Sequence, residues 1–420
     1  MRQSLAINSE RVIVMEQYED IRMRCDAARA AARRAAEASA RSRGAAIKAI
    51  ADRLLSDSEL ILDANRHDIE AAQGQLAEHM IERLHLDETR IGNLCDELLA
   101  LAAAPDPLGM GTFGTRPSGL EIARRRVPLG AIAFVYDCRP ELAVRAVAMC
   151  IKTANAAIIS PSYASVNTDA ALVDIMCDAL EGSAYPHDAV CYIDPTLADV
   201  PEMLGRMRGS VDLIVCGGER GLRDKLAEGT VPVMMAGNGI SHIYIDESCD
   251  VQAAVKATVR SIYPRNVETS GSVVVLVHKR AAQDYLGAMY RSMQPYHPEY
   301  RACPASREYL SEAIPAVRDD WSAQHENTSN TIAVRVVESM DEAIAHINTY
   351  GTAHADAIMT THMGRSKKFV REVDSTTVCV NAALKMSDTV GAGGILAGVE
   401  LEALTGEKCI ISGDVAVTDK

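Results

Sequence analysis

The chain has 420 residues, of which 48% are apolar and 24% charged, and its formal net charge is −14. A chain of this length and composition can bury large hydrophobic cores, which we expect to be divided among two or more domains. The negative charge argues against a nucleic-acid partner, because a phosphate backbone requires a clustered positive field.

The cysteine spacing and the length of the apolar runs exclude further classes of protein. Eleven cysteines show neither CxxC nor Cys/His spacing, which argues against a metal site and a disulfide framework. They are typical of reduced, mostly buried thiols. No apolar run approaches the ~20 residues that cross a bilayer, and the N-terminus lacks the pattern of a signal peptide. We therefore expect a cytoplasmic protein without a membrane partner.

The first quarter of the chain is predicted to be helical. Residues 1–14 are expected to form a loose extension, and from Met15 to about Ala104 apolar residues recur at spacings of three and four. The run 28–46 is rich in Arg, but its density of Ala indicates a helix with a solvated basic face. These helices must pack against later elements, because nothing within them forms a sheet.

Strands and helices alternate after a Pro- and Gly-rich stretch at 105–119. This order predicts a parallel sheet with helical crossovers. Strands are expected at Leu120–Arg126, Gly130–Tyr136, Ala156–Ser160, Ala189–Ile193 and Val211–Val215, and helices at Glu141–Thr153, Asp169–Leu180, Val200–Met207 and, after the Gly217-Gly218 turn, Arg220–Glu228.

A second α/β domain is expected from about residue 248 to 385. Just before it, in the first domain, a strand is predicted at His242–Asp246. Within it, strands are predicted at Ser272–Val277, Ile332–Val337, Ala357–Thr361 and Thr377–Asn381, and helices at Val251–Arg260, Ala281–Met293, Asp341–Tyr350 and Arg365–Val373. Residues 294–331 are poorly periodic. A last strand, Lys408–Ser412, is of the kind that commonly pairs with a partner's edge.

Ligands of open parallel sheets gather at the carboxyl ends of the strands. The segments expected around one cleft are Tyr136–Pro140, Ser160–Ser162, Cys216–Gly218, Met235–Gly239 and Ser261–Ser270. Neither a GxGxxG fingerprint nor a P-loop occurs in the required context. The Gly217-Gly218 pair either places backbone amides near a phosphate or makes a tight turn.

Two cysteines and one histidine near these strand ends could have either a functional or a structural role. Cys138 and Cys216 are either reactive thiols or small buried residues, and His242 is more consistent with a structural histidine. In the segment 261–271, Thr269 and Ser270 carry hydroxyls that need a neighbouring base, and Glu268 is adjacent in sequence. The alternative is a polar connecting loop.

Several segments together resemble one family. They are ANRHDIEAA, RRRVPLGAIAFVYDCRP, CIKTANAAII, HIYIDES, DEAIAHINTYGTAHADAI, VREVDSTTVCVNAA and LEALTGEKCIISGD. In order and spacing, from about Met15 to Asp414, they resemble the γ-glutamyl phosphate reductases (glutamate-5-semialdehyde dehydrogenases) of the aldehyde dehydrogenase superfamily.

The resemblance implies an aldehyde-dehydrogenase-like α/β fold with two parallel-sheet, Rossmann-like domains and a small oligomerisation element. It assigns 15–106 and 131–247 to an NADPH-binding domain, 248–385 to a catalytic domain, and 107–130 with 386–420 to oligomerisation. In that family, NADPH reduces L-glutamate 5-phosphate to the semialdehyde in proline biosynthesis, through attack of a cysteine thiolate. A homo-oligomer, with a possible hetero-partner, is the implied assembly.

The residues that would perform this chemistry are changed. The nucleophilic cysteine of the family falls on Thr269 and its following asparagine on Ser270. The asparagine after Arg-Pro is Glu141, and two Arg-Gly-Gly motifs become Ser160-Pro161-Ser162 and Cys216-Gly217-Gly218. The site residues that the resemblance carries over are Arg139, Arg265 and Asn381 toward the substrate and Ser160, Ser162, Gly217, Gly218 and Glu326 toward the cofactor, with no metal.

These changes leave three interpretations. The first is a reductase with impaired or lost activity, since removal of a covalent nucleophile costs several orders of magnitude in rate. The second is an active reductase in which Cys138 or Cys216 replaces the missing thiol, or in which the loop that contains Thr269 is built differently. The third is a non-catalytic paralogue that binds a partner subunit, a nucleotide or a metabolite.

Overall fold

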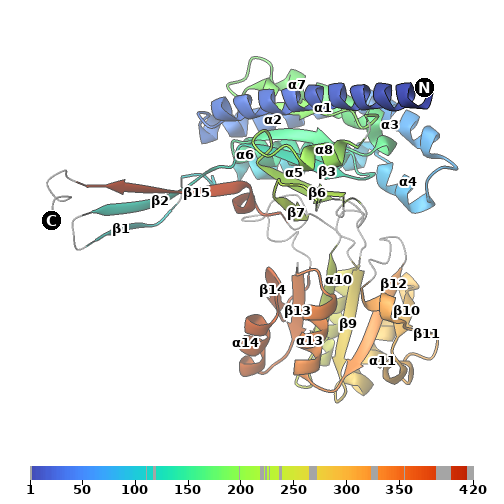
Figure 1. Cartoon of the computed structure of the whole chain (residues 1–420). Helices are drawn as coiled ribbons and strands as arrows, with labels where there is room; N and C mark the ends of the chain where they lie inside the picture. The colour runs from blue at the N-terminus through green and yellow to red at the C-terminus, as the bar shows by residue number, and fades with distance from the viewer. Residues whose placement is uncertain are drawn as a thin grey trace. The chain divides into compact units, whose positions relative to one another are not determined.

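The computed structural model describes residues 2–109, 111–116, 120–197, 199–217, 222, 225–226, 228–235, 239–263, 272–322, 330–353, 355–384 and 399–413. The chain divides into two compact units, Met1–Ala236 with Thr389–Lys420, and Gly237–Asp388 (Figure 1). In this described part of the chain, none of the helices is both long and apolar enough to cross a membrane.

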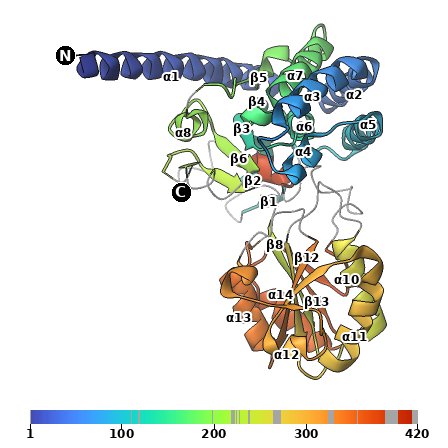
Figure 2. The ribbon, with the colours of Figure 1, turned by 90° about the vertical axis from the view of Figure 1, so that its right-hand side faces the viewer.

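The first unit begins with helices, as the periodicity predicts. They are α1 Arg2–Ala35, α2 Ala40–Ser56, α3 Ser58–Ala72, α4 Glu78–Leu84 and α5 Glu88–Ala103. Residues 2–14 form the first turns of α1 (Figure 2), so the expectation of a loose extension is wrong. The physical reason is that the segment Arg2–Ala35 contains neither Gly nor Pro, so no residue interrupts the helix.

A five-stranded parallel sheet forms the centre of the first unit. Its order is β5 Val190–Tyr192, β4 Ala156–Ser160, β3 Ala131–Tyr136, β6 Leu213–Gly217 and β7 Val233–Met235. Its crossovers include α6 Glu141–Lys152, α7 Val166–Leu180 and α8 Val200–Gly205. Every residue of β3 and β4 is buried, as expected of strands that are covered on both faces.

Three antiparallel strands make a separate small sheet in the same unit, with β1 Phe113–Thr115, β2 Glu121–Pro128 and β15 Thr405–Ser412 in this order. The last strand pairs with β2 along its whole length, from Thr405 opposite Pro128 to Ser412 opposite Glu121. The predicted strand at Lys408–Ser412 therefore pairs first within its own chain, and within the described residues its outer edge has no partner strand.

The second unit contains a seven-stranded parallel sheet. Its order is β11 Ile314–Pro315, β10 Glu299–Ala302, β12 Thr331–Val337, β9 Ser272–His278, β8 Ile240–Ile245, β13 Ala355–Met359 and β14 Thr377–Val380, and its helices are α10 Val251–Ile262, α11 Ala282–Met293, α12 Pro304–Arg307, α13 Met340–Tyr350 and α14 Met363–Glu372. The expected boundary after residue 247 is wrong, because β8 pairs with β9 and β13 of this sheet.

The side chains of this sheet alternate between two cores. Ile243 and Ile245 of β8 join one cluster with Tyr285 and Met289 of α11. Tyr244 of β8 points to the other, which contains Phe369 of α14 among others. Because successive side chains of a strand point to opposite faces, one apolar sequence contributes to the cores on both faces of the sheet. The strand ends that carry the candidate site residues are therefore anchored by packing on both sides.

Candidate active site

The carboxyl edge of the five-stranded sheet brings together three of the segments that the sequence singles out. Tyr136 ends β3, Ser160 ends β4 and Gly217 ends β6, with Tyr136 opposite Gly217. The chain proceeds from β3 to β4 and β5 on one side, and then places β6 and β7 on the other. Such a reversal of strand order is where open α/β sheets bind ligands.

Two loops at this edge are joined by a hydrogen bond from a backbone N–H to a side-chain hydroxyl. The N–H of Cys138 donates to Oγ of Ser162 at 3.2 Å, and Cys138 adopts a left-handed φ of 44°. Its side chain is 2% exposed and lies in an apolar cluster with Ala72 and Leu84. Cys216 is 0% exposed within the main core. Both residues thus belong to buried apolar clusters, where structural cysteines are commonly found.

Arg139 and Glu141 are buried beside each other in sequence at the start of α6. Burial, together with the nearby Arg83, lowers the pKa of Arg139 to about 10. Nη2 of Arg90 lies 3.5 Å from Oε1 of Glu141. Because Glu141 is in the first turn of α6, its negative charge offsets the positive end of the helix, which would otherwise attract an anionic substrate.

A buried pair beneath this edge was not anticipated from the sequence. The hydroxyl of Tyr136 donates to Oδ1 of Asp169 at 2.7 Å. Burial raises the pKa of Asp169 to about 8, while the hydroxyls of Ser165 and Tyr136 act in the opposite direction. At neutral pH, Asp169 is therefore held mainly in its neutral form, next to the strand end at which ligands are expected.

The N-terminus of α7, which follows β4, is already capped by a carboxylate of the protein. Asp68 of α3 accepts the backbone N–H of Asn167 at 3.2 Å and that of Thr168 at 2.7 Å, and it also binds both side chains. Asn65, three residues earlier, bonds Thr168 as well. A phosphate could bind at this helix end only by displacing Asp68. The sequence signal was two polar residues, Asn65 and Asp68, one helical turn apart.

At the reversal between β3 and β6, Gly217 and Ser162 are the described residues that would contact a nicotinamide dinucleotide. Gly217 has no side chain to obstruct a ligand, and the half-buried Ser162 accepts one hydrogen bond but can still donate its own proton. Ser160 is 2% exposed, so its hydroxyl faces the interior. Gly218 and Glu326, the other expected cofactor contacts, lie outside the described residues.

In the second unit, residues 261–263 lie at the amino edge of the sheet. Since β8 and β9 are parallel, α10 must return the chain from the carboxyl end of β8 to the amino end of β9. For residues 261–263, the expectation of a place after strand carboxyl ends is therefore wrong, and residues 264–271 lie outside the described residues. Thr269, the expected nucleophile position, and Arg265 lie outside the described residues.

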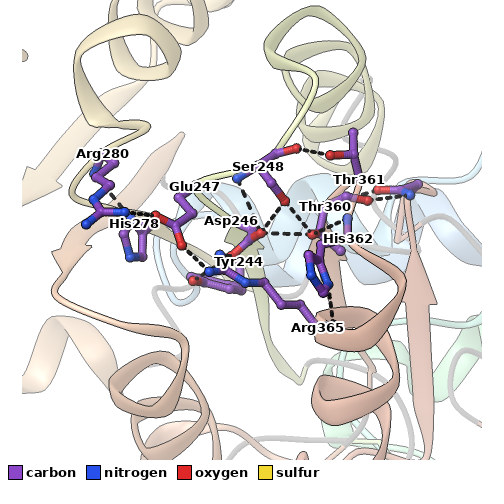
Figure 3. Close-up of polar contacts among 11 residues, drawn as sticks. Tyr244, Asp246, Glu247, Ser248, His278, Arg280, Thr360, Thr361, His362 and Arg365 are labelled. Atoms are coloured by element: carbon purple, nitrogen blue, oxygen red, sulfur yellow. Dashed lines mark hydrogen bonds and ion pairs between the residues drawn. The ribbon is translucent and has the colours of Figure 1, made fainter.

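The carboxyl edge of this second sheet holds a network centred on Asp246 (Figure 3). Its fully buried carboxylate accepts from the hydroxyls of Ser248 at 2.6 Å and Thr360 at 2.8 Å, and from Nη1 of Arg365 at 2.8 Å. Burial alone would raise the pKa of Asp246, but these donors lower it. Because donors from the protein already bind both carboxylate oxygens, we interpret Asp246 as a structural residue that holds these segments together.

Asn381, an expected substrate contact, belongs to this same edge. It follows β14 and has a φ of 54°. Its Oδ1 accepts the N–H of Thr360 at 2.9 Å, and its Nδ2 donates to the carbonyl of Thr360 at 2.9 Å. The oxygen and the nitrogen of the Asn381 side-chain amide thus join the end of β14 to the end of β13. This edge of the sheet is opposite to the one where α10 ends and β9 begins.

His242 occupies the structural role that the sequence favoured. It is fully buried in β8, and its Nδ1 lies 3.0 Å from Oδ1 of Asp356, which also accepts the N–H of His242. Within the described ranges, His, Cys, Asp and Glu form no group of three or more that could hold a metal ion.

Comparisons with known proteins decide the family. A model described as "Aldehyde dehydrogenase family" matches residues 12–297. A γ-glutamyl phosphate reductase of Carboxydothermus hydrogenoformans is 35% identical over 364 residues, 86% of this chain and 87% of that protein. Another, of Meiothermus ruber, is 36% identical over 372 residues, 88% of each. The chain belongs to the aldehyde dehydrogenase family.

The structure agrees with this assignment. A crystal structure of γ-glutamyl phosphate reductase from Thermotoga maritima has a TM-score of 0.82 and 29% sequence identity, and the match covers 96% of this chain and 99% of that one. The predicted α/β fold with parallel sheets is confirmed. Membership of the aldehyde dehydrogenase family also indicates a nicotinamide cofactor.

Proposed function

We propose that this aldehyde dehydrogenase family member descends from NADPH-dependent γ-glutamyl phosphate reductases and has lost most or all of their reductase activity. The observation that carries the proposal is the absence of a cysteine between α10 and β9. The helix ends at Ile262 and the strand begins at Ser272, and the connecting residues YPRNVETSG include Thr269 at the family's nucleophile position but no thiol.

The cysteines elsewhere in the second unit support this reading. Cys249 and Cys303 follow the carboxyl ends of β8 and β10, and Cys379 is the third residue of β14. All three lie toward the edge opposite to the one where α10 ends and β9 begins. Burial raises the pKa of Cys249 to about 11 and also raises that of Cys379, so these groups are poor nucleophiles at neutral pH.

The two thiols considered as replacements in the first unit are also unsuitable. Cys138 and Cys216 are almost completely buried, and neither is accessible to a substrate without movement of the backbone. A threonine hydroxyl has a far higher pKa than a thiol and needs a general base to attack a carbonyl carbon. A negative charge on Glu141 would in addition disfavour the phosphate of an acyl phosphate substrate.

The reaction lost would be a displacement followed by a reduction. A thiolate forms a bond to the acyl carbon while the bond to phosphate breaks, and hydride then replaces the sulfur to release the aldehyde. A nicotinamide cofactor supplies that hydride when bound. Gly217 and Ser162 are the described residues that would hold the dinucleotide, and retention of this pocket would leave a protein that binds NADPH without turning over substrate.

The test is the reverse reaction on purified protein. Glutamate 5-semialdehyde, phosphate and NADP⁺ are mixed with the unmodified protein, with Thr269→Cys and with Ser270→Cys, and NADPH formation is followed by absorbance. We expect the unmodified protein and the Ser270→Cys control to be inactive, and Thr269→Cys to gain at least about tenfold over background. Turnover of about 10 per second in the unmodified protein, a typical enzyme value, would overturn the proposal.

A role in binding is the second candidate, and β15 favours it. The strand is an edge strand of eight residues, and most of it is exposed, including Ile410 and Ile411. An open edge is a template for pairing with another chain. We propose that β15 mediates homo-oligomerisation in the cytoplasm. All eleven cysteines are described and none forms a disulfide, which supports this location.

A further inference from the structure

The carboxyl end of β4 is where the first sheet would meet the adenosine half of a dinucleotide. β3, α6 and β4 form a parallel strand–helix–strand unit. In such units, side chains near the end of the second strand contact the ribose of the adenosine. NADPH differs from NADH by one phosphate on that ribose. The charges around the end of β4 therefore bear on which of the two dinucleotides is preferred.

A half-buried carboxylate stands at this edge, after the neighbouring strand β5. Tyr192, which ends β5, pairs with Ile159 of β4, and Ile193 still donates its N–H to the carbonyl of Ile159 at 2.9 Å. Asp194 is the next residue, so it reaches the edge beside the segment 160–162. Its Oδ1 accepts a backbone N–H at 2.8 Å, whereas its Oδ2 accepts no hydrogen bond within the described part of the chain.

Further carboxyl groups lie at the same edge. Asp68 caps the start of α7 and is 3% exposed. The hydroxyl of Tyr192 donates to the carbonyl of Val166, the first residue of α7, at 3.2 Å. Burial raises the pKa of Tyr192, and so do nearby carboxyl groups, first Asp169 and then Asp194. Because Asp169 is mainly neutral at pH 7, the negative charge at this edge belongs to Asp68 and Asp194.

The described segments that meet here bring no cation that offsets these carboxylates. They contain a single arginine and no lysine, over 65–69, 160–169 and 190–197. The guanidinium of that arginine, Arg66, is 63% exposed and bonds Asp63 at 2.9 Å. Arg66 and Asp68 are two residues apart in α3, so they do not face each other. A phosphate beside the end of β4 would thus meet carboxylates without a guanidinium to neutralise it.

We propose that the dinucleotide pocket of the first unit binds NADH in preference to NADPH, and that Asp194 sets this preference. A ribose hydroxyl can donate a hydrogen bond to the open Oδ2 of Asp194. A phosphate at the same place carries about two negative charges at pH 7 and is repelled by the carboxylate. The inference rests on the proposed function, because it names the dinucleotide that the retained pocket favours. NADPH would still bind there, but more weakly.

The first test compares the two dinucleotides on the unmodified 420-residue chain. Binding of NADH and of NADPH is measured by isothermal titration calorimetry in the absence of substrate. We expect the dissociation constant of NADPH to be at least about tenfold higher than that of NADH. Equal constants, tighter binding of NADPH, or binding of neither dinucleotide would overturn the proposal.

Asp194→Asn tests the residue itself, because it keeps the shape of the side chain and removes the charge. Binding of NADPH should become at least about threefold tighter relative to that of NADH. Asp188→Asn is the matched control: Asp188 is exposed and comes just before β5, at the opposite edge of the sheet, where it pairs with Arg34. An unchanged ratio in Asp194→Asn, or the same change in Asp188→Asn, would contradict the role of Asp194.

A variant that adds a cation tests the preference from the opposite direction. Tyr163 follows Ser162 and is 69% exposed, so its replacement leaves the core intact. Tyr163→Arg should bind NADPH at least about tenfold more tightly than Tyr163→Gln, which loses the same ring without adding charge; equal affinities would contradict the proposal. These readouts need no turnover. Reductase activity of the unmodified protein would overturn the proposed loss of activity but would leave the measured preference as it is.

Discussion

The hydroxyl of Tyr136 donates a 2.7 Å hydrogen bond to the carboxyl of Asp169, and both side chains are buried in the first unit. The pKa of Asp169 rises from its ordinary value of 3.8 to about 8 on folding. Between these values the folded protein binds a proton that the unfolded chain has released, so the free energy of unfolding falls as the pH rises from about 4 to about 8.

Asp169→Asn removes this pH dependence, because asparagine stays neutral and can still accept from Tyr136. We expect the variant to gain roughly 4 kcal/mol more, relative to the unmodified protein, at pH 8 than at pH 5. Urea denaturation at both pH values measures this difference. Asp174→Asn, an exposed position on the same helix α7, is the control, and an equal pH effect there would contradict the assignment to Asp169.

The network around Asp246 predicts a loss of stability when its cation is removed. Arg365→Ala leaves the buried carboxylate with hydroxyl donors and the backbone N–H of Ser248 only, and since the arginine is 32% exposed, we expect a cost of about 1–2 kcal/mol. The pKa of Asp246 is lowered in the folded state, so its stabilisation is present above about pH 4 and is lost as the pH falls through the folded pKa.

Chemical denaturation at pH 7 and pH 3 tests the contribution of the Asp246–Arg365 interaction to the free energy of unfolding. The cost of Arg365→Ala should shrink at the lower pH. Arg280→Ala serves as control: its guanidinium pairs with Glu247 but is 73% exposed, so its loss should cost less than about 0.5 kcal/mol. Equal costs for the two arginines would show that burial of Asp246 is not the deciding factor.

The burial of the thiols predicts an order of alkylation under native conditions. Cys409 on β15 is exposed, whereas Cys138 and Cys216 are at most 2% exposed. We expect iodoacetamide to label Cys409 at least about a hundredfold faster than either of the other two, as read from peptide mass spectra. Rapid native labelling of Cys138 or Cys216 would revive the idea that one of them acts as a nucleophile.

The open edge of β15 predicts an assembly that a charge can weaken. Ile411 is 63% exposed, and we expect Ile411→Lys to raise the dissociation constant of the oligomer at least about tenfold in sedimentation experiments. Leu60→Lys makes the same chemical change at a leucine of equal exposure on α3 and should leave assembly unchanged. A monomeric unmodified protein would exclude this role for the strand.

The buried strands could be predicted because their sequences are nearly continuous apolar runs. Ala131–Tyr136 and Ala156–Ser160 are examples, and the helices between them end close to the expected residues. The short strands β10 and β11 were not predicted, because four and two residues are too few for a periodic pattern. A local sequence pattern predicts a strand but not the sheet to which the strand belongs. The strand β8 is an example, because only its pairing with β9 places it in the second sheet.

The candidate site was predicted only in part, for geometric reasons. The strand ends at Tyr136 and Gly217 were placed correctly at one sheet edge. The capping of α7 by Asp68 joins residues a hundred positions apart, and no local pattern reports such a contact. The rule that ligands gather at the carboxyl ends of strands also led to the wrong edge for Ser261. Ser261 lies near the C-terminus of the crossover helix α10, and a crossover helix ends at the amino edge of the sheet.

The pairing of β15 with β2 has a consequence for biosynthesis. The partner of Glu121–Pro128 is made almost three hundred residues later, and Leu401 and Leu404, which fill part of the first unit's core, also come from the end of the chain. A nascent chain on the ribosome therefore exposes one unpaired edge of β2 and an apolar gap until translation is nearly finished. During that interval the protein depends on chaperones or on rapid completion to escape aggregation.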